Sequence, residues 1–235
     1  GDWADLADYA EAKGIYVYLA VDTANVSNWN TLSTYTDKGH EIVAHSRHHV
    51  DLKNRTGMKV QYTGAAASGT MTIDVASNSI ITTTTGGVDD LSIDISDASY
   101  DTVGEVVAYI NGQANYTASS FPATGYNDSA LCTSLADITT QDIKTAEYTV
   151  NMDNTRFFTE EVTGAKTDIE NNISGYTCKV FVFPYNYHDE TACDAVKSAG
   201  FLGAFTGSSG EYDLTDLDIF KLARLDLSAQ IADTD

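Results

Sequence analysis

The sequence predicts an α/β domain that is interrupted by a small β-rich inserted domain. Helix-like and strand-like segments alternate at both ends of the chain, which is typical of parallel strands joined by crossover helices. Between residues 57 and 130 the chain is instead rich in Thr, Ser, Gly and Ala, with alternating segments typical of strands and turns. We therefore expect residues 1–56 and 131–235 to form one domain, and residues 57–130 to form a second domain inserted into it.

The first part of the larger domain has a clear order of elements. Residues 2–13 predict a helix that Gly14 ends, and the apolar run IYVYLAV (15–21) predicts a strand buried on both faces. A helix is expected at 28–37, followed by a turn and a short strand at 39–45. His45 falls at the carboxyl end of that strand.

The second part repeats the alternation. An amphipathic helix is expected at 155–175, a buried strand at 178–185, a helix capped by Asp189 at 189–200 and a strand at 201–205. The inserted domain is expected to contain one helix of its own, at 101–112, where valine and isoleucine side chains form one apolar face.

The charge excludes several classes of partner. The chain of 235 residues has 13 basic and 34 acidic residues and a net charge of −21, which argues against nucleic acid or an anionic membrane surface. Its longest apolar run, 14–21, is too short to span a membrane. No signal peptide is recognisable, so we expect the chain to begin downstream of any targeting segment. As a separate expectation, the protein acts outside the cell or on its surface.

Two further features concern covalent chemistry. Three cysteines, Cys132, Cys178 and Cys193, lack the spacing of a zinc knuckle or a thioredoxin site. One disulfide with one free thiol and three buried thiols are both compatible with this spacing. Asn-x-Ser/Thr sequons, which mark exposed loops where they are glycosylated, occur at Asn25, Asn54, Asn115, Asn127 and Asn172.

The most informative stretch is GHEIVAHSRHHVDL (39–52), which holds four of the five histidines. His45 and His49 are four residues apart and can converge on one ion if the chain turns back after the strand. A site with two histidines needs a third protein ligand, commonly a carboxylate, and leaves a position open for water. On the spacing alone, a solvated polar turn is the simpler interpretation.

The context of this stretch resembles the polysaccharide deacetylase family (NodB homology, carbohydrate esterase family 4). A Gly-His-Glu-Ile lead-in and the motif His-Ser-x-x-His are present, FVFPYNYHDETACDAVKSAGF (181–201) is similar to the third motif, and DIFKLARLDL (218–227) to the closing segment. The likeness covers roughly residues 1–56 and 135–228. It implies an irregular (β/α) barrel, a glycan substrate, and a divalent metal, with zinc as the first candidate.

The resemblance also implies roles for individual residues. His45 and His49 would be metal ligands, Ser46 would brace their loop, and Tyr185 would lie at the floor of the substrate groove. His40 and His48 match no ligand position. We expect His40 to pack near the site and His48 to face solvent.

The chain departs from the family pattern at catalytic positions. No Asp-Asp strand precedes the first helix, so we expect the third ligand and the catalytic base, if present, to come from a strand before Gly1. A Leu-x-His motif, the usual source of the general acid, is absent, and Val182 stands where an arginine is common.

Three functions remain open on the sequence. The first is a metal-dependent deacetylase acting on acetylated glycans. The second is a catalytically inactive extracellular structural module, such as a filament, phage-tail or adhesin subunit, whose open sheet edge accepts a strand from a neighbour. The third is a carbohydrate-binding module, suggested by aromatic residues such as Trp29, although packing in the core or at an interface explains those residues better.

Overall fold

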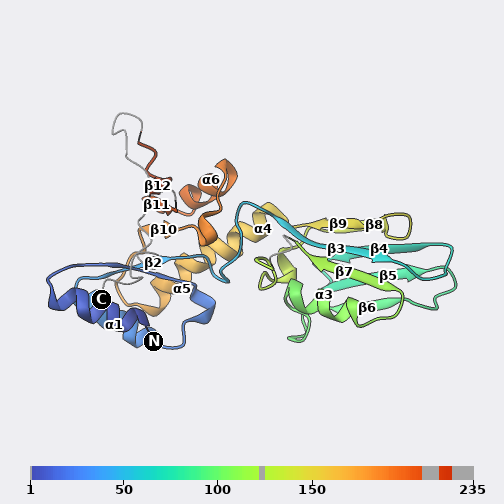
Figure 1. Ribbon diagram of the computed structural model, residues 1–235, viewed down its shortest axis with the longest axis horizontal. Helices are drawn as coiled ribbons and strands as arrows, with labels where there is room; N and C mark the ends of the chain where they lie inside the picture. Colours follow the sequence, from blue (N-terminus) through green and yellow to red (C-terminus); the bar gives the residue numbers. More distant parts are fainter. Residues whose placement is uncertain (1, 122–124, 208–216, 224–235) are drawn as a thin grey trace, which may run out of the picture. The chain divides into compact units, whose positions relative to one another are not determined.

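The computed structural model describes residues 2–121, 125–207 and 217–223. The chain divides into two compact units (Figure 1). Unit 1 comprises residues 1–53 and 160–235, and unit 2 comprises residues 54–159. In the parts of the chain that are described, no helix is both long and apolar enough to cross a bilayer.

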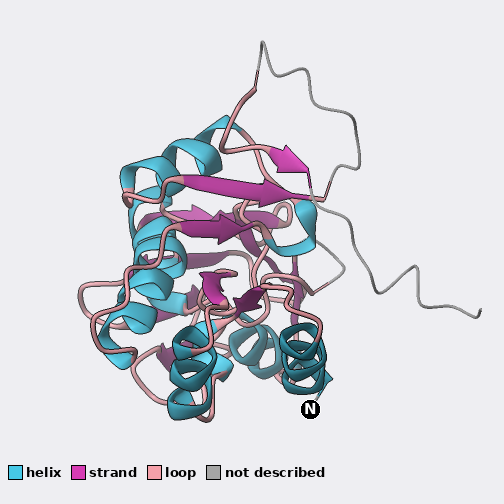
Figure 2. Ribbon diagram, turned by 90° about the vertical axis from the view of Figure 1, so that its left-hand side faces the viewer, coloured by secondary structure: helices cyan, strands magenta, loops and turns pink. Residues whose placement is uncertain are grey.

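Unit 1 is a mixed α/β unit, as the alternating sequence pattern predicts. Its helices are α1 (Asp2–Ala12), α2 (Trp29–Asp37), α5 (Gly164–Asn172) and α6 (Glu190–Ser198), and its strands are β1 (Tyr18–Val21), β2 (Glu41–Ala44), β10 (Val180–Val182), β11 (Gly203–Thr206) and β12 (Leu222–Ala223). The strands form one sheet in the order β1-β2-β10-β11-β12, and every pairing is parallel. Figure 2 shows helices (cyan) beside strands (magenta). The closing segment expected at 218–227 lies outside the described residues from position 224 onward.

Local signals explain the helix boundaries in unit 1. The Asn28 side chain accepts a hydrogen bond from the backbone N–H of Thr31 at the start of α2, 3.2 Å away. Asp189 caps α6 in the same way, 2.8 Å from the backbone nitrogen of Ala192. Gly200 follows α6 with φ of +79°, a conformation that favours glycine.

The sheet of unit 1 is strongly curved. The rings of Tyr18 on β1 and Phe205 on β11 lie 5.7 Å apart, although β2 and β10 separate their strands. In a flat sheet these two strands would be about 14 Å apart, because neighbouring strands are spaced by about 4.8 Å. Among the described residues the pairing nevertheless runs from β1 to β12 without joining these end strands, so a closed barrel is not seen.

A cluster of phenylalanines forms the centre of unit 1. Phe181 on β10 is fully buried, and its ring lies 5.3 Å from that of Phe183 and 5.4 Å from that of Phe201, both in edge-to-face geometry. Because β10 is the middle strand of the sheet, this cluster fixes the strand that leads to Tyr185.

A tyrosine hydroxyl completes the edge of β2 where β10 has not yet begun. The Tyr176 hydroxyl accepts a hydrogen bond from the backbone N–H of Ile42, at 3.0 Å, and also lies 2.6 Å from a Glu41 carboxylate oxygen. The side chain thus stands in for the missing strand residue. Burial and the Glu41 hydrogen bond both raise the pKa of Tyr176, which keeps its hydroxyl protonated.

Replacing Tyr176 by phenylalanine is expected to lower the free energy of unfolding of unit 1 by about 1–3 kcal/mol, because a backbone N–H would lose its acceptor in a largely buried position. Tyr9→Phe, at a side chain that is 64% exposed, is the control and should change the value by less than about 0.5 kcal/mol. Denaturant unfolding of both variants measures the difference. Equal stabilities would show that Tyr176 does not replace a strand contact.

Unit 2 is built mainly of antiparallel strands. Its strands are β3 (Thr56–Tyr62), β4 (Gly69–Asp74), β5 (Ser79–Thr84), β6 (Leu91–Asp94), β7 (Tyr116–Ser120), β8 (Ile138–Asp142) and β9 (Tyr148–Asn151), with helices α3 (Val103–Asn111) and α4 (Asn154–Phe158). They form two sheets, β7-β3-β9 and β6-β5-β4-β8. Helix α3 packs on β7 and β3 and begins with a capping box formed by Thr102 and Glu105.

Unit 2 extends further along the chain than the composition of residues 57–130 suggests. Strand β8 pairs with β4, and β9 pairs with β3. These long-range pairings include residues 138–151 in unit 2, beyond the expected boundary at residue 130.

The helix expected at 155–175 is divided into three pieces. Helix α4 is followed by a π-helix, Thr159–Thr163, and then by α5. The four apolar residues expected on one side, Phe158, Val162, Ala165 and Ile169, are all buried. Their spacing fits the interrupted helix as well as a continuous one, so the π-turn cannot be recognised from the apolar pattern.

The three cysteines are all buried free thiols. Burial raises the pKa of Cys132 to about 12 and that of Cys178 and Cys193 to about 11. Of the two arrangements compatible with the sequence, the structure has three buried thiols.

Candidate functional site

The candidate site lies at the carboxyl edge of the unit 1 sheet, where β1, β2 and β10 end side by side. Parallel strands present their carboxyl ends at one edge, which is where α/β folds commonly bind ligands. His45 directly follows β2, and its backbone N–H donates to the carbonyl of Val21 at 2.9 Å. Residues 45–49 then form a tight loop, which we call the histidine loop.

His45 and His49 point their rings at one another. Their Nε2 atoms lie 3.1 Å apart. The other nitrogen of each ring is also engaged: His45 Nδ1 lies 2.7 Å from the carbonyl oxygen of Val182, and His49 Nδ1 lies 3.0 Å from the hydroxyl of Tyr185. Since a carbonyl only accepts, His45 Nδ1 carries the proton, and the Nε2 of the neutral ring presents a lone pair toward His49.

This arrangement fits two ligands of a divalent metal. Two metal–nitrogen bonds of about 2.05 Å across a 3.1 Å separation would meet at about 100°, near the tetrahedral angle of zinc sites. Orientation of a histidine ligand through its other ring nitrogen, by a backbone carbonyl or a side chain, is usual at metal centres. The part of the chain that is described contains no group of three or more His, Cys, Asp or Glu side chains able to hold a metal.

Backbone strain is concentrated at this site. Among the described residues, three that are neither glycine nor asparagine have positive φ: Ser46 at 62°, His49 at 58° and Tyr185 at 53°. All three belong to the histidine loop or contact it. Such conformations cost about 1–3 kcal/mol each and persist where the surroundings enforce them, frequently at functional sites.

The loop is also braced from within. The Ser46 side chain is fully buried, and its hydroxyl oxygen accepts a hydrogen bond from the backbone N–H of Val50 at 3.3 Å. The backbone carbonyl oxygens of Ser46 and Arg47 accept hydrogen bonds from the backbone N–H groups of Thr23 and Ala24, which lie in the turn after β1.

His48 does not face solvent as expected. Its Nδ1 lies 2.8 Å from a carboxylate oxygen of Glu161, a fully buried residue in the π-helix Thr159–Thr163. Burial acts to lower the pKa of His48, but the hydrogen bond and the charge of Glu161 outweigh it, so this pKa lies above its ordinary value. The expectation of an exposed side chain was wrong because the acidic partner is 113 residues away in sequence.

His40 packs away from the site rather than beside it. It is buried before the first residue of β2, and its Nδ1 accepts from the backbone N–H of Val17 at 3.2 Å. Four residues separate His40 from His45, so along an extended chain the two lie about 16 Å apart, at 3.3 Å for each of five steps. His188 has its Nδ1 3.1 Å from the carbonyl of Asn186 and its ring beside Phe183.

Tyr185 contacts His49 through its ring as well as its hydroxyl. The two rings lie 4.6 Å apart in edge-to-face geometry. The geometry therefore gives Tyr185 an orienting contact with a candidate ligand; its expected place at the floor of a substrate groove stays a prediction.

The sequons differ in exposure. Asn25, Asn115 and Asn172 are exposed and Asn54 is half-buried. Asn127 is fully buried, and its side-chain amide donates to the carbonyl oxygens of Asn54 and Thr56. A glycan at Asn127 would require this contact to open.

The principal residue that sequence reasoning missed is Glu161. It follows Phe157 by four positions, and both side chains are fully buried, so they share one face of the chain. An acidic residue on an apolar face is the signal that could have identified a buried partner for the histidine loop.

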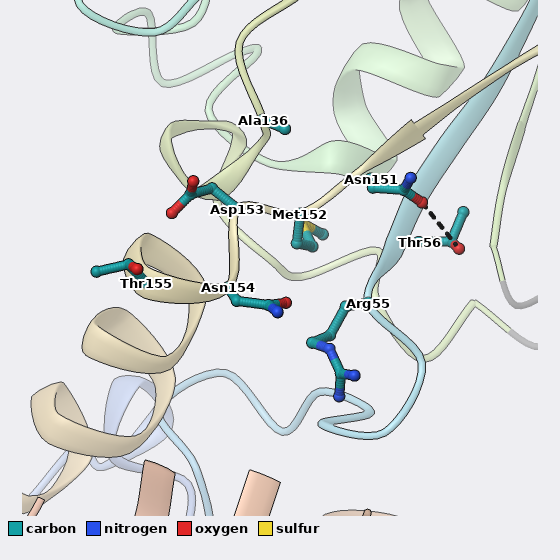
Figure 3. A pocket seen from close by; sticks show the side chains of 8 residues that line it. All are labelled: Arg55, Thr56, Ala136, Asn151, Met152, Asp153, Asn154 and Thr155. Carbon is teal, nitrogen blue, oxygen red and sulfur yellow. Dashed lines mark hydrogen bonds between the residues drawn. The ribbon is translucent and has the colours of Figure 1, made fainter. Parts of the chain in front are cut away.

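Unit 2 has a hollow of its own, with a volume of about 550 Å³ (Figure 3). It is lined by Arg55, Thr56, Ala136, Asn151, Met152, Asp153, Asn154 and Thr155. Several of its polar groups serve the fold: Asp153 caps α4, and the Thr56 hydroxyl donates to the side-chain amide oxygen (Oδ1) of Asn151. The hollow therefore offers hydrogen-bonding groups without a nucleophile placed beside a base.

Comparison with known proteins gives a distant structural likeness. No protein-family model and no curated protein sequence matches the chain. It is similar to a de-N-acetylase from Aggregatibacter actinomycetemcomitans (TM-score 0.43, 13% identity) and to the BpsB deacetylase domain from Bordetella bronchiseptica (TM-score 0.47, 13% identity). Each alignment covers 94% of this chain, which spans 63% of the first structure and 65% of the second. Similarity at this level does not establish a chemical activity, so the side chains of the site must be considered by themselves.

Proposed function

We propose that unit 1 carries the histidine half of a metal-dependent carbohydrate deacetylase centre, which hydrolyses acetyl groups on a glycan. The observation that carries this proposal is the convergence of the His45 and His49 Nε2 atoms, each on a ring whose other nitrogen is held. A divalent metal, with zinc as first candidate, would there polarise an acetyl carbonyl and activate water.

The residues of this chain have defined tasks in the proposal. His45 and His49 bind the ion, the Val182 carbonyl and Tyr185 orient them, and the strained loop holds the two nitrogens together before the ion arrives. The proposal requires a further carboxylate that completes the site and acts as base, and no such residue is assigned among the described residues. The curved sheet would then belong to an irregular (β/α) barrel, with unit 2 as a domain inserted into it.

A second candidate is a catalytically inactive extracellular structural module on the same fold. The observation that favours it is the lack of a third metal ligand among the described residues. Strand β1 also stands at the end of the sheet order, and Tyr16 and Tyr18 nearby are 70% and 57% exposed. In this candidate a neighbouring copy adds a strand at β1, and location outside the cell is part of the same proposal.

Acetate release separates the two candidates. The protein loaded with zinc or cobalt is incubated with chitin oligomers and with acetylated xylan, and acetate is measured against His45→Ala. Release by the wild type that is lost in the variant supports the deacetylase. Stoichiometric metal binding without acetate release favours the inactive module, and absence of bound metal contradicts a metal centre in this chain.

A further inference from the structure

We propose that Glu161 is the positioning residue of the histidine pair, because its buried carboxylate fixes the loop between the two candidate ligands. The inference rests on the proposed metal centre and adds a residue outside the His-Ser-x-x-His motif. Its basis is a set of contacts that join Glu161 to the backbone of the histidine loop.

One carboxylate oxygen of Glu161 serves the loop backbone. Its Oε2 accepts from the N–H of Arg47 at 3.2 Å and from the N–H of His48 at 2.9 Å. The other oxygen, Oε1, lies 2.8 Å from His48 Nδ1. These contacts fall on two of the three residues between His45 and His49, so the carboxylate acts on the segment that sets the separation of their rings.

Burial makes these contacts specific. The Glu161 side chain has 0% exposure, and a carboxylate is costly to bury unless its oxygens are paired and hydrogen-bonded. Here the partners are two backbone N–H groups and the Nδ1 of His48. The backbone N–H groups of Arg47 and His48 donate to Oε2 of this buried carboxylate. If the carboxylate were removed, water could not readily take its place as the acceptor.

The loop is held from two sides that are independent of one another. Its carbonyl groups, on Ser46 and Arg47, accept from the turn after β1, while its N–H groups donate to Glu161. Removing the carboxylate leaves the first set intact. We therefore expect the fold of unit 1 to persist and the orientation of residues 46–49 to loosen.

The neighbour of Glu161 in sequence, Glu160, also contacts the histidine loop. Glu160 and Glu161 are consecutive residues in the π-helix Thr159–Thr163, yet both contact the histidine loop. Glu160 contacts the loop through the Arg47 guanidinium, at 2.6 Å. Glu160 therefore provides a matched control, since its removal deletes an equal side chain that binds no backbone group of the loop.

The test compares Glu161→Ala, Glu161→Gln and Glu160→Ala with the wild type. Cobalt(II) affinity is measured from the visible absorption of the bound ion, and amide exchange of Arg47 and His48 is measured in metal-free protein. We expect Glu161→Ala to weaken cobalt binding about 10–100-fold, as for other residues that orient metal ligands, and to accelerate exchange at both amides. Glu161→Gln keeps a carbonyl acceptor and should restore most of both properties, and Glu160→Ala should resemble the wild type.

The two readouts distinguish failure of this inference from failure of the metal centre. Wild-type protein that binds no cobalt contradicts the proposed function, and the exchange of Arg47 and His48 then decides the role of Glu161 alone. Unchanged exchange in Glu161→Ala overturns the positioning role. Cobalt affinity in Glu161→Ala equal to that of the wild type overturns it as well, while leaving the metal site in place.

Discussion

Replacing Phe181 by alanine is expected to lower the free energy of unfolding of unit 1 by about 3–5 kcal/mol. The ring is fully buried and packs edge to face against Phe183 and Phe201, so truncation leaves a cavity lined by rigid aromatic side chains. Both tryptophans of the chain, Trp3 and Trp29, belong to unit 1, so tryptophan fluorescence in a denaturant titration reports this unit. The loss is a large part of the stability of an ordinary domain.

A matched control lies on the same unit. Leu202 is 66% exposed, and Leu202→Ala should change stability by no more than about 0.5 kcal/mol. A loss below about 1 kcal/mol for Phe181→Ala would contradict the assignment of the phenylalanine cluster as the centre of the unit. The strand concerned also matters for the site, because it carries the Val182 carbonyl that accepts from His45.

Replacing either His45 or His49 by alanine is expected to abolish measurable binding of a divalent metal. Each variant removes one of the two nitrogens that would bind the metal. Loss of a residue that only orients a ligand lowers metal affinity about 10–100-fold, and loss of a ligand should lower it further. Cobalt titration of the purified variants measures the effect. Tyr185→Phe, which keeps the ring against His49 and removes the hydroxyl, should weaken binding within that smaller range.

The control for this series is another histidine. His188→Ala removes an imidazole whose described contacts are with Asn186 and Phe183, so its metal affinity should equal that of the wild type. Equal losses in all the histidine variants would indicate a general effect on the fold. Retained affinity in both His45→Ala and His49→Ala would place the metal elsewhere.

Features with local causes could be predicted from the sequence. The helices α2, α3 and α6 have polar caps beside an apolar face, and the structure places them within a few residues of the expected ranges. The convergence of His45 and His49 follows from a strand end and a four-residue spacing. These features depend on residues that are neighbours in sequence.

Features that depend on distant residues could not be predicted. The pairing of β8 with β4 and of β9 with β3 depends on the tertiary fold, and it moves the edge of unit 2 to Thr159. The role of His48 depends on Glu161, more than a hundred residues away. Glu161 lies in a π-turn, and the spacing of the apolar residues around it is the same as that expected for an unbroken helix. The sequence pattern therefore does not reveal the π-turn.

X-ray absorption at the zinc edge of the zinc-loaded protein tests the central claim most directly. We expect one zinc ion per chain with two imidazole ligands at about 2.0–2.1 Å, and a His45→Ala protein in which the two-imidazole signal is lost. A wild-type spectrum without imidazole scattering, or protein that retains no zinc after dialysis, would contradict a metal centre built on His45 and His49.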